Sequence, residues 1–292
     1  MAIDLFTIGR FTIHGYGLMI GIGFLIGVLV GIIRAKKRGL SPDHLTNIAI
    51  YVLLFGFLGG KLLFIIVEYR DFFADPLGAL GSEGFVVYGG VITGILTILI
   101  YCRIKKISAL TYMDLFAPSV AINQGLGRVG CFLAGCCYGR PTDSPIGVVF
   151  PEGCQAPAGV KLIPTQLFSA GGMLLIALGL ILYAKKARYR GTVTGYYLLS
   201  YSVGRFIIEF FRNDYRGSVG VLSTSQFISI FIFALSVVIL VIAYRKQIPV
   251  EYHTLSNNRD VESASESESA SESESASESE SASESESGQG YE

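Results

Sequence analysis

The stretch Asn123-Gln-Gly-Leu-Gly-Arg128-Val-Gly-Cys-Phe-Leu-Ala-Gly-Cys-Cys-Tyr-Gly-Arg140-Pro-Thr142 decides how the rest of the chain is interpreted. It places the Arg128 guanidinium among glycines, within an apolar run long enough to enter a lipid bilayer. A charge near the centre of a membrane helix costs about 2.5 kcal/mol or more, so this arginine is a candidate functional residue. Two structural explanations stay open: the side chain reaches the membrane surface, or it pairs with a buried carboxylate.

The composition is that of a membrane protein with several transmembrane segments. Of the 292 residues, 51% are hydrophobic and 16% are charged, and the mean hydropathy is +0.53. Basic residues gather in short segments between apolar runs, whereas many acidic residues follow Val261, and this distribution gives no support for nucleic-acid binding. The first apolar run ends in basic residues without a small-residue cleavage site, so we expect the first helix to remain in the mature protein.

Seven apolar runs have the length that a helix needs to cross the hydrocarbon core of a bilayer, about 20 residues. The runs cover approximately residues 16–33, 45–67, 85–102, 115–135, 165–183, 194–211 and 225–244. We therefore predict an all-α polytopic membrane protein in which residues 1–250 form a transmembrane catalytic domain with seven transmembrane helices. Residues 251–292 differ, because Ser-Ala-Ser-Glu-Ser-Glu repeats there cannot form a core, and we predict a disordered cytoplasmic tail.

Basic residues follow every second apolar run, and this alternation predicts the orientation. They stand at Arg34, Lys36, Lys37 and Arg38, at Arg103, Lys105 and Lys106, at Lys185, Lys186, Arg188 and Arg190, and at Arg245 and Lys246. Loops rich in lysine and arginine stay on the cytoplasmic side of the membrane. The N-terminus is therefore predicted outside and the C-terminus in the cytoplasm. A six-helix alternative, in which the fourth run is re-entrant, would break the alternation.

This orientation places six polar residues at a similar depth, in the outer half of the membrane, because each helical residue advances about 1.5 Å. They are Tyr16, Lys61, Tyr88, Arg128, Arg205 and Glu209. Glycine pairs stand beside two of them, at Gly59 and Gly60 and at Gly89 and Gly90. Glycines permit close helix packing or close approach of a ligand. We expect Lys61, Gly89 and Gly90 to line a polar cavity, with helix packing as the alternative.

The segment Arg205-Phe-Ile-Ile-Glu209-Phe-Phe-Arg212 has charged residues at spacings of four and three, which places them on one helix face. One interpretation is that Glu209 orients one arginine while the other binds an anion, since guanidinium groups suit phosphate oxygens. The alternative is a self-contained ladder of ion pairs that lets the helix enter lipid. The two interpretations are compatible with each other.

Five cysteines, an odd number without a C-x-x-C spacing, predict neither a disulfide framework nor a zinc site. Cys102 and Cys154 stand apart from the other three. Cys131, Cys136 and Cys137 belong to the stretch quoted above, where packing as small apolar residues and exposure to oxidising surroundings both stay open. No metal and no cofactor is predicted.

Four segments resemble the prolipoprotein diacylglyceryl transferase family, whose members are bacterial inner-membrane enzymes. The resemblance spans about residues 15–246, and the first segment begins one residue earlier. These segments are His14-Gly-Tyr-Gly-Leu-Met19, Phe85-Val-Val-Tyr-Gly-Gly90, Gly127 to Thr142 and Arg205 to Arg212. The resemblance implies transfer of the diacylglyceryl group from phosphatidylglycerol to the lipobox cysteine in the signal peptide of an exported prolipoprotein. A thioether forms and glycerol phosphate leaves. It also implies seven helices in the bacterial cytoplasmic membrane, with the N-terminus outside.

The resemblance also implies roles for single residues. Arg128 and Arg205 match the family's essential arginines, so Arg128 would hold the phosphate and Arg205 the reacting headgroup. Tyr16 matches a tyrosine that lines the family's site, and Tyr88 stands at the position of a family histidine. Such chemistry needs fixed positive charge for the departing phosphate and a thiol that loses its proton near neutral pH, but no cofactor.

The chain departs from the family pattern where the acceptor thiol would be activated. The family has histidine in place of Tyr88, and Asn, Asn and Glu in place of Cys131, Ala134 and Cys136. Tyrosine, with an ordinary pKa of about 10, is a poor base at neutral pH. Activation by the two arginines and proton transfer to His14 stay open. A paralogue with another acceptor, which would use the cysteines, and a lipid-binding or transport protein are the competing functions.

Overall fold

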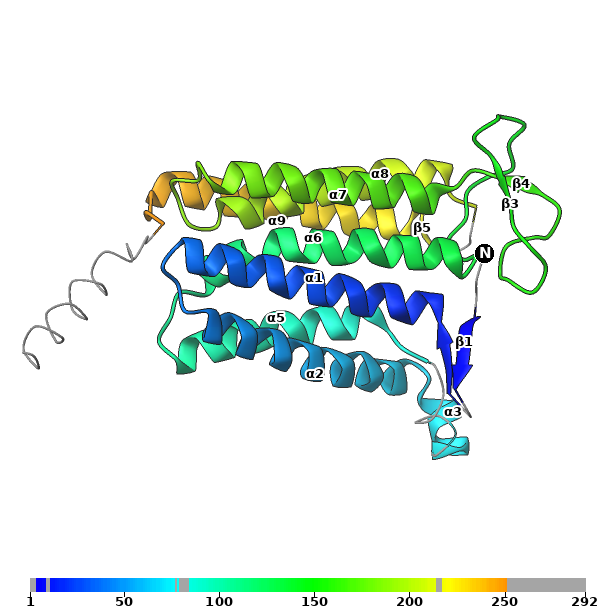
Figure 1. Ribbon diagram of the computed structural model, residues 1–292, viewed down its shortest axis with the longest axis horizontal. Helices are drawn as coiled ribbons and strands as arrows, with labels where there is room; N and C mark the ends of the chain where they lie inside the picture. The colour runs from blue at the N-terminus through cyan, green and yellow to red at the C-terminus, as the bar shows by residue number, and fades with distance from the viewer. Residues whose placement is uncertain (1–3, 9–10, 77, 79–83, 214–216, 251–292) are drawn as a thin grey trace, which may run out of the picture. The chain divides into compact units, whose positions relative to one another are not determined.

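Seven helices of 17 to 26 residues lie side by side in the part of the chain that the structure describes (Figure 1). The structure is a computed structural model that describes residues 4–8, 11–76, 78, 84–213 and 217–250. The long helices are α1 (Gly15–Lys37), α2 (Pro42–Val67), α5 (Val87–Ile104), α6 (Ala109–Leu133), α7 (Thr165–Ala184), α8 (Thr192–Ile208) and α9 (Thr224–Lys246). The predicted tail at 251–292 lies outside the described residues.

The shorter elements gather at one end of the long helices, as Figure 1 shows. They are the antiparallel pairs β1 (Asp4–Ile8) with β2 (Phe11–His14), β3 (Val148–Val149) with β4 (Lys161–Leu162) and β5 (Ser218–Val219) with β6 (Leu222–Ser223), the helix α3 (Tyr69–Ala74), and the 3-10 turn η1 (Glu209–Phe211) that continues α8. Among the described residues, all longer elements are helices, and a loop at 134–164 joins α6 to α7.

Serine side chains define where three of the long helices begin. Ser41 accepts a hydrogen bond from the backbone of His44 at the start of α2, and Ser108 caps α6 in the same way. At α9, Ser223 and Gln226 cap each other reciprocally, through hydrogen bonds of 3.2 and 3.1 Å. Such caps satisfy backbone N–H groups that have no partner within the helix, which stabilises these boundaries.

Five of the described helices, α1, α2, α5, α7 and α9, are long and apolar enough to cross a membrane. Large apolar side chains on them stay exposed, as with Leu25 of α1 (68% exposed) and Leu175 of α7 (71%). Outward-facing surfaces of this kind suit contact with lipid rather than water. The predicted helical membrane fold is confirmed. The count of seven spans and the sidedness stay predictions.

The helix α6 is the central element of the fold. It packs on α1, α7 and α8, while α2 pairs with α5 and α8 with α9 (Figure 1). Glycines of α1 let the two backbones approach, since a Cβ at Gly23 would meet Asn123 and a Cβ at Gly27 would meet Ser119. Small residues four positions apart are a common device for close packing of membrane helices. The stretch that carries Arg128 is thus held from several sides.

One end of the group of long helices contains the C-terminal ends of α1, α5, α7 and α9 and the N-terminal ends of α2, α6 and α8 (Figure 1). The basic residues found after every second apolar run therefore share one end of the helices, as the alternation requires. The helix α6 is continuous over 25 residues, although it contains Pro118. A continuous helix of this length reaches about 37 Å, which favours a spanning over a re-entrant segment.

A buried carboxylate ties the start of α8 to α6. Asp114 accepts hydrogen bonds from the backbone N–H groups of Gly191 (2.7 Å) and Thr194 (2.8 Å) and from the Thr194 hydroxyl (2.7 Å). Its exposed fraction is 2%. The carboxylate thus supplies acceptors to the first turn of a helix whose own residues leave these groups without partners.

Replacing this carboxylate should destabilise the fold markedly. We expect Asp114→Ala to lower the free energy of unfolding by about 2–3 kcal/mol, because buried N–H groups lose a charged acceptor. Reversible unfolding in mixed micelles with increasing denaturing detergent measures the change. Asp143→Ala, at an exposed loop position, should alter stability by less than about 0.5 kcal/mol. Equal midpoints for the two variants would contradict the role of Asp114.

Candidate functional site

The chain reverses direction directly after α6. The backbone N–H of Cys136 donates to the carbonyl of Cys131 (3.1 Å), and Gly135 and Cys137 have positive φ angles of 65° and 62°. This conformation is unusual for a residue other than glycine, so the position of Cys137 is fixed by its surroundings. As a result, the sulfur atoms of Cys131, Cys136 and Cys137 lie within 4.8 Å of one another. We call this group the thiol cluster.

The first turn of α7 holds the thiol cluster in place. The Thr165 hydroxyl donates to the carbonyl of Cys137 (2.9 Å), and the Gln166 amide donates to the carbonyl of Cys136 (2.8 Å). Both donor side chains belong to buried residues. The sequence identifies Thr165 and Gln166 only as the start of a helix. Their second role follows from a contact between distant segments.

The segment after the thiol cluster joins the end of α8. The N–H of Arg140 donates to the carbonyl of Phe211 (3.0 Å), and the N–H of Asn213 donates to the carbonyl of Tyr138 (3.3 Å). Residue Ile163 completes the arrangement, because its carbonyl accepts from Gly139 and its N–H donates to Arg140, both at 3.0 Å. The two arginine-bearing motifs of the sequence are therefore connected through their backbones.

Gly139 stands where the three segments meet, and no larger residue fits there. A Cβ atom would lie 2.7 Å from the Ile163 carbonyl oxygen and 2.8 Å from that of Phe211. We expect Gly139→Ala to cost about 1–3 kcal/mol of stability, because backbone atoms must move apart. Thermal unfolding in detergent measures it. Gly172→Ala, on α7 with open space around the glycine, should not destabilise. A lower melting temperature for this control would refute the steric argument.

Ion pairs connect the charged residues at the end of α8. Arg205 Nη1 lies 2.6 Å from Glu209 Oε2, at an angle outside the range of a hydrogen bond, and Arg212 Nε lies 3.8 Å from the same oxygen. The exposed fractions of these three side chains are 11%, 3% and 8% for Arg205, Arg212 and Glu209. Arg205 Nη2 also donates to the Ser225 hydroxyl of α9 at 2.5 Å. The ladder predicted from the spacing is present, and α9 adds a partner.

Arg128 lies near this ladder. Its guanidinium is half-buried on α6 and is close enough to that of Arg205 for the two charges to repel each other. It also lies near the Tyr16 phenol and the Cys131 thiol. A Cβ on Gly130 would touch Tyr16, so α1 and α6 are in direct contact at this level. The structure thus brings Tyr16, Arg128 and Arg205 together.

The Arg128 side chain forms no hydrogen bond or ion pair with any residue that the structure describes. Pairing with a buried carboxylate, one explanation for an arginine in this stretch, is therefore not found among these residues. The Glu209 carboxylate pairs with Arg205 and Arg212, and the nearby Arg128 guanidinium adds a positive charge that has no such partner among the described residues. Excess positive charge in a half-buried place attracts an anion.

The other predicted residues lie on the pair formed by α2 and α5. A Cβ at Gly89 or Gly90 would meet the backbone carbonyl of Gly59 or Gly56, so the contacts seen are those of helix packing. Tyr88 is 49% exposed. Among the described residues no hydrogen bond or ion pair links Tyr88 or Lys61 to the arginines. Substrate binding by Lys61, Gly89 and Gly90 and catalysis by Tyr88 stay predictions.

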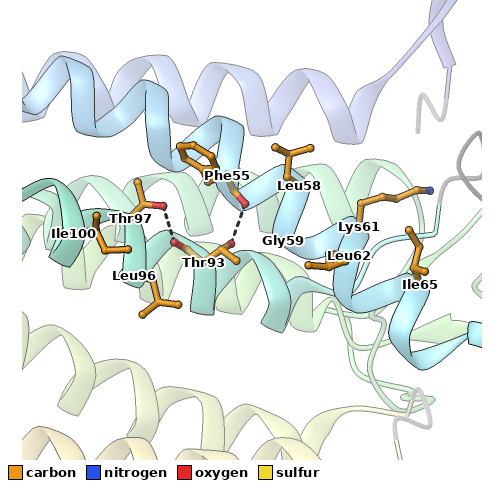
Figure 2. Close-up of a pocket in the computed structure, with 10 residues that line it drawn as sticks. All are labelled: Phe55, Leu58, Gly59, Lys61, Leu62, Ile65, Thr93, Leu96, Thr97 and Ile100. Carbon is orange, nitrogen blue, oxygen red and sulfur yellow. Dashed lines mark hydrogen bonds between the residues drawn. The ribbon is translucent and has the colours of Figure 1, made fainter.

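A groove of about 520 Å³ runs between α2 and α5 (Figure 2). It is lined by Phe55, Leu58, Gly59, Lys61, Leu62, Ile65, Thr93, Leu96, Thr97 and Ile100. The Thr93 hydroxyl donates to the Phe55 carbonyl (3.0 Å), and the Thr97 hydroxyl donates to the Thr93 carbonyl (2.7 Å). Both hydroxyl groups are therefore hydrogen-bonded to the backbone. The Lys61 ammonium points away from the apolar side chains, toward one end (Figure 2). The groove suits an alkyl chain better than a polar headgroup.

Lys61 itself is tied to the segment before α5. Its Nζ atom donates to the Gly84 carbonyl at 3.3 Å and lies 5.1 Å from the centre of the Phe64 ring. His14, considered as an alternative base, is an exposed residue at the end of β2.

The Cys136 thiol, which lies beyond the end of α6, has a raised pKa. Hydrogen bonding to the thiol of Cys131 and then to that of Cys137 raises the pKa of Cys136, and burial adds to the effect. The sequence predicts no cluster here, because the spacing of these cysteines is not that of a familiar metal motif. The closeness of the three thiols depends on the turn that follows α6.

Comparison with known proteins gives a consistent result. The family model of prolipoprotein diacylglyceryl transferase matches residues 4–242. The chain is 46% identical over 246 residues to the phosphatidylglycerol–prolipoprotein diacylglyceryl transferase of Clostridium tetani, which covers 83% of this chain and 98% of the relative.

Two further relatives extend the comparison. The enzyme numbered 2 of Clostridium perfringens is 46% identical over 234 residues, covering 80% of this chain and 91% of the relative. That of Finegoldia magna is 32% identical over 247 residues, covering 83% and 96%. Both carry the same transferase name. The resemblance drawn from the four sequence segments is confirmed, and the chain belongs to the prolipoprotein diacylglyceryl transferase family.

Proposed function

We propose that this chain transfers the diacylglyceryl group of phosphatidylglycerol to the lipobox cysteine thiol of exported prolipoproteins. The observation that carries the proposal is the excess positive charge formed by Arg128 beside Arg205, Glu209 and Arg212. Phosphatidylglycerol brings one phosphate charge, and the released glycerol phosphate brings more. Fixed guanidinium groups stabilise such developing charge without reorganising during the reaction.

The residues divide the work according to their contacts. Arg128, without a polar partner among the described residues, is the group that holds the phosphate through bidentate hydrogen bonds. Arg205 is fixed by Glu209 and Ser225, so its guanidinium is preorganised toward the reacting headgroup. Tyr16 lines the same place from α1.

The reaction is a displacement at a glycerol carbon. The thiolate sulfur of the acceptor attacks the carbon that carries the phosphate ester, a carbon–sulfur bond forms, and the carbon–oxygen bond breaks. The electron pair of that bond leaves with glycerol phosphate. The acceptor thiol must first lose its proton, because the thiolate is the reactive form.

The proposal includes a place and an orientation in the cell. The enzyme spans the bacterial cytoplasmic membrane seven times, with the N-terminus outside and the arginines in the outer half. The basic residues at one end of the helices support this orientation. α8 and η1 together give 20 helical residues, and α6 gives 25, which is sufficient for the two less apolar helices to span.

A defined assay tests the transfer. The purified full chain in detergent receives phosphatidylglycerol labelled in both the diacylglycerol and the headgroup, together with a lipobox peptide. We expect a thioether-linked diacylglyceryl peptide and an equal amount of glycerol phosphate. A peptide with serine in place of the lipobox cysteine is the control and should yield neither product. Lipid binding without products would overturn the proposal in favour of a carrier or of a paralogue with another acceptor.

A further inference from the structure

The thiol cluster has a geometry that the transfer proposed above does not use. Three sulfur atoms within 4.8 Å of one another need only a small inward movement to bind one ion. At a zinc ion, with zinc–sulfur bonds of about 2.3 Å in a tetrahedron, the sulfur atoms lie about 3.8 Å apart. None of the three cysteines forms a disulfide. No disulfide therefore has to break before the three sulfur atoms bind an ion.

The surroundings hold the thiol cluster in this form. The hydrogen bonds from Thr165 and Gln166 fix the two carbonyls of Cys136 and Cys137, so both side chains leave a rigid backbone. Cys131 is anchored separately, in the last turns of α6. Support of this kind around the ligands is typical of protein metal sites, because it orients the ligands before the ion arrives.

The charge beside the thiol cluster is complementary to a metal–thiolate centre. Three thiolates and one divalent ion have a net charge of −1. Arg128 lies close to Cys131, and its side chain has no ion-pair partner among the described residues. This is an observation independent of the sulfur positions. A centre with one negative charge would be stabilised by the positive charge of the nearby Arg128 guanidinium.

We propose that Cys131, Cys136 and Cys137 form a three-thiolate binding site for a zinc ion. Cys131 and Cys137 are buried and Cys136 is half-buried, so Cys136 is the most accessible of the three ligands. Zinc sites with three protein ligands keep a fourth position for water or substrate, whereas structural sites use four protein ligands. The site belongs to the open class.

A role in acceptor activation follows, and this part rests on the proposed transfer. A zinc ion held by Cys131, Cys136 and Cys137 would favour loss of the lipobox thiol proton to solvent, and the resulting thiolate would attack the glycerol carbon as described. Zinc keeps its oxidation state, so the step needs no oxidant or reductant. A thiol that coordinates zinc is deprotonated at neutral pH, and the transfer needs this deprotonation. The zinc site explains why thiols stand next to the phosphate-binding arginine.

The test measures the metal directly. The full chain is purified with a reductant and without chelator, and its zinc content is determined by mass spectrometry, with one ion per chain expected. Cobalt(II) added after chelator treatment should give thiolate-to-cobalt charge-transfer absorption and the strong visible bands of tetrahedral coordination. Cys131→Ser, Cys136→Ser and Cys137→Ser should each weaken cobalt binding at least about 100-fold, since even second-shell changes cost 10- to 100-fold.

Two matched cysteine variants serve as controls. Cys102 is buried in α5, and the Cys154 thiol donates to the carbonyls of Pro151 (3.2 Å) and Ala156 (3.7 Å). Cys102→Ser and Cys154→Ser should keep one metal ion per chain and an unchanged cobalt spectrum. Loss of binding in Cys154→Ser would overturn the open three-ligand site in favour of a closed site with four cysteines.

Further outcomes separate this inference from the transfer itself. If the unmodified chain gave cobalt bands but no diacylglyceryl product, the result would support the metal site and contradict the proposed transfer. Full transfer by a chain that contains no metal and gives no cobalt–thiolate bands would overturn the metal site and leave the transfer standing. Because both measurements use the unmodified chain, they remain decisive even if a serine variant fails to fold.

Discussion

Arg128→Ala should reduce the rate of diacylglyceryl transfer at least about 100- to 1,000-fold, the cost of removing one preorganised group that stabilises transition-state charge. The effect should fall mainly on kcat, because the charge on the departing phosphate grows as the carbon–oxygen bond breaks. The fold should be retained, since the Arg128 side chain has no hydrogen bond or ion pair among the described residues. Glycerol phosphate release measures the rate, and thermal unfolding measures the fold.

Two further variants make this result specific. Arg128→Lys keeps the charge but loses the bidentate geometry, so it should retain a small part of the activity. Arg103→Ala removes an exposed arginine at the other end of the helices and should leave the rate unchanged. A folded Arg128→Ala variant with the rate of the unmodified chain would show that another group holds the phosphate.

Glu209→Ala should damage both stability and activity. Its carboxylate is the partner of Arg205 and Arg212, and all three side chains are at most 11% exposed. Removing one member of a buried ionic group costs about 3–5 kcal/mol, because charges are left buried without compensation. Unfolding in mixed micelles should show this loss. Transfer should fall as well, because Arg205 loses the contact that positions it.

A second change distinguishes the ionic effect from general damage. Adding Arg212→Met to Glu209→Ala removes a buried charge that has lost the Glu209 carboxylate and should restore part of the stability. Glu152→Ala, at an exposed loop position, should change neither stability nor rate. If the double variant were less stable than Glu209→Ala, the ion pair between Arg212 and Glu209 would have no stabilising part in the structure.

The helices could be predicted from the sequence because each apolar run has the length of a membrane span. The start of the fourth run was predicted too late, at about Leu115 instead of Ala109. The residues between them include Asp114, whose charge lowers local hydropathy. In the structure this carboxylate is buried and binds the start of α8. Hydropathy cannot predict that Asp114 is buried, because the groups that donate hydrogen bonds to its carboxylate belong to a segment much later in the chain.

The charged residues show the same limit. Spacings of four and three predicted the ladder of Arg205, Glu209 and Arg212, because contacts within one helix follow from its geometry. Ser225 could not be predicted, since it reaches Arg205 from another helix. The thiol cluster was missed for a similar reason. It depends on a turn with positive φ at Gly135 and at Cys137, and only the first of these residues signals it.

The glycine pairs were ambiguous in the sequence, and the structure gives the contacts that were lacking. Glycine before Lys61 and glycine after Tyr88 fit a cavity wall as well as helix packing. The backbone of Gly59 fills the space where a Cβ on Gly89 would stand, so the two pairs face each other. Sequence spacing alone cannot reveal that two glycines on different helices are neighbours.

The backbone pairing between the segment after α6 and the end of α8 bears on how the protein matures. The carbonyl of Tyr138 accepts from Asn213, and the N–H of Arg140 donates to Phe211. During synthesis, domains form from the N-terminal side as the ribosome proceeds. The segment that follows Arg128 on α6 therefore lacks these hydrogen-bond partners until α8 has been synthesised. We therefore expect a chain that ends before Phe211 to lack transferase activity.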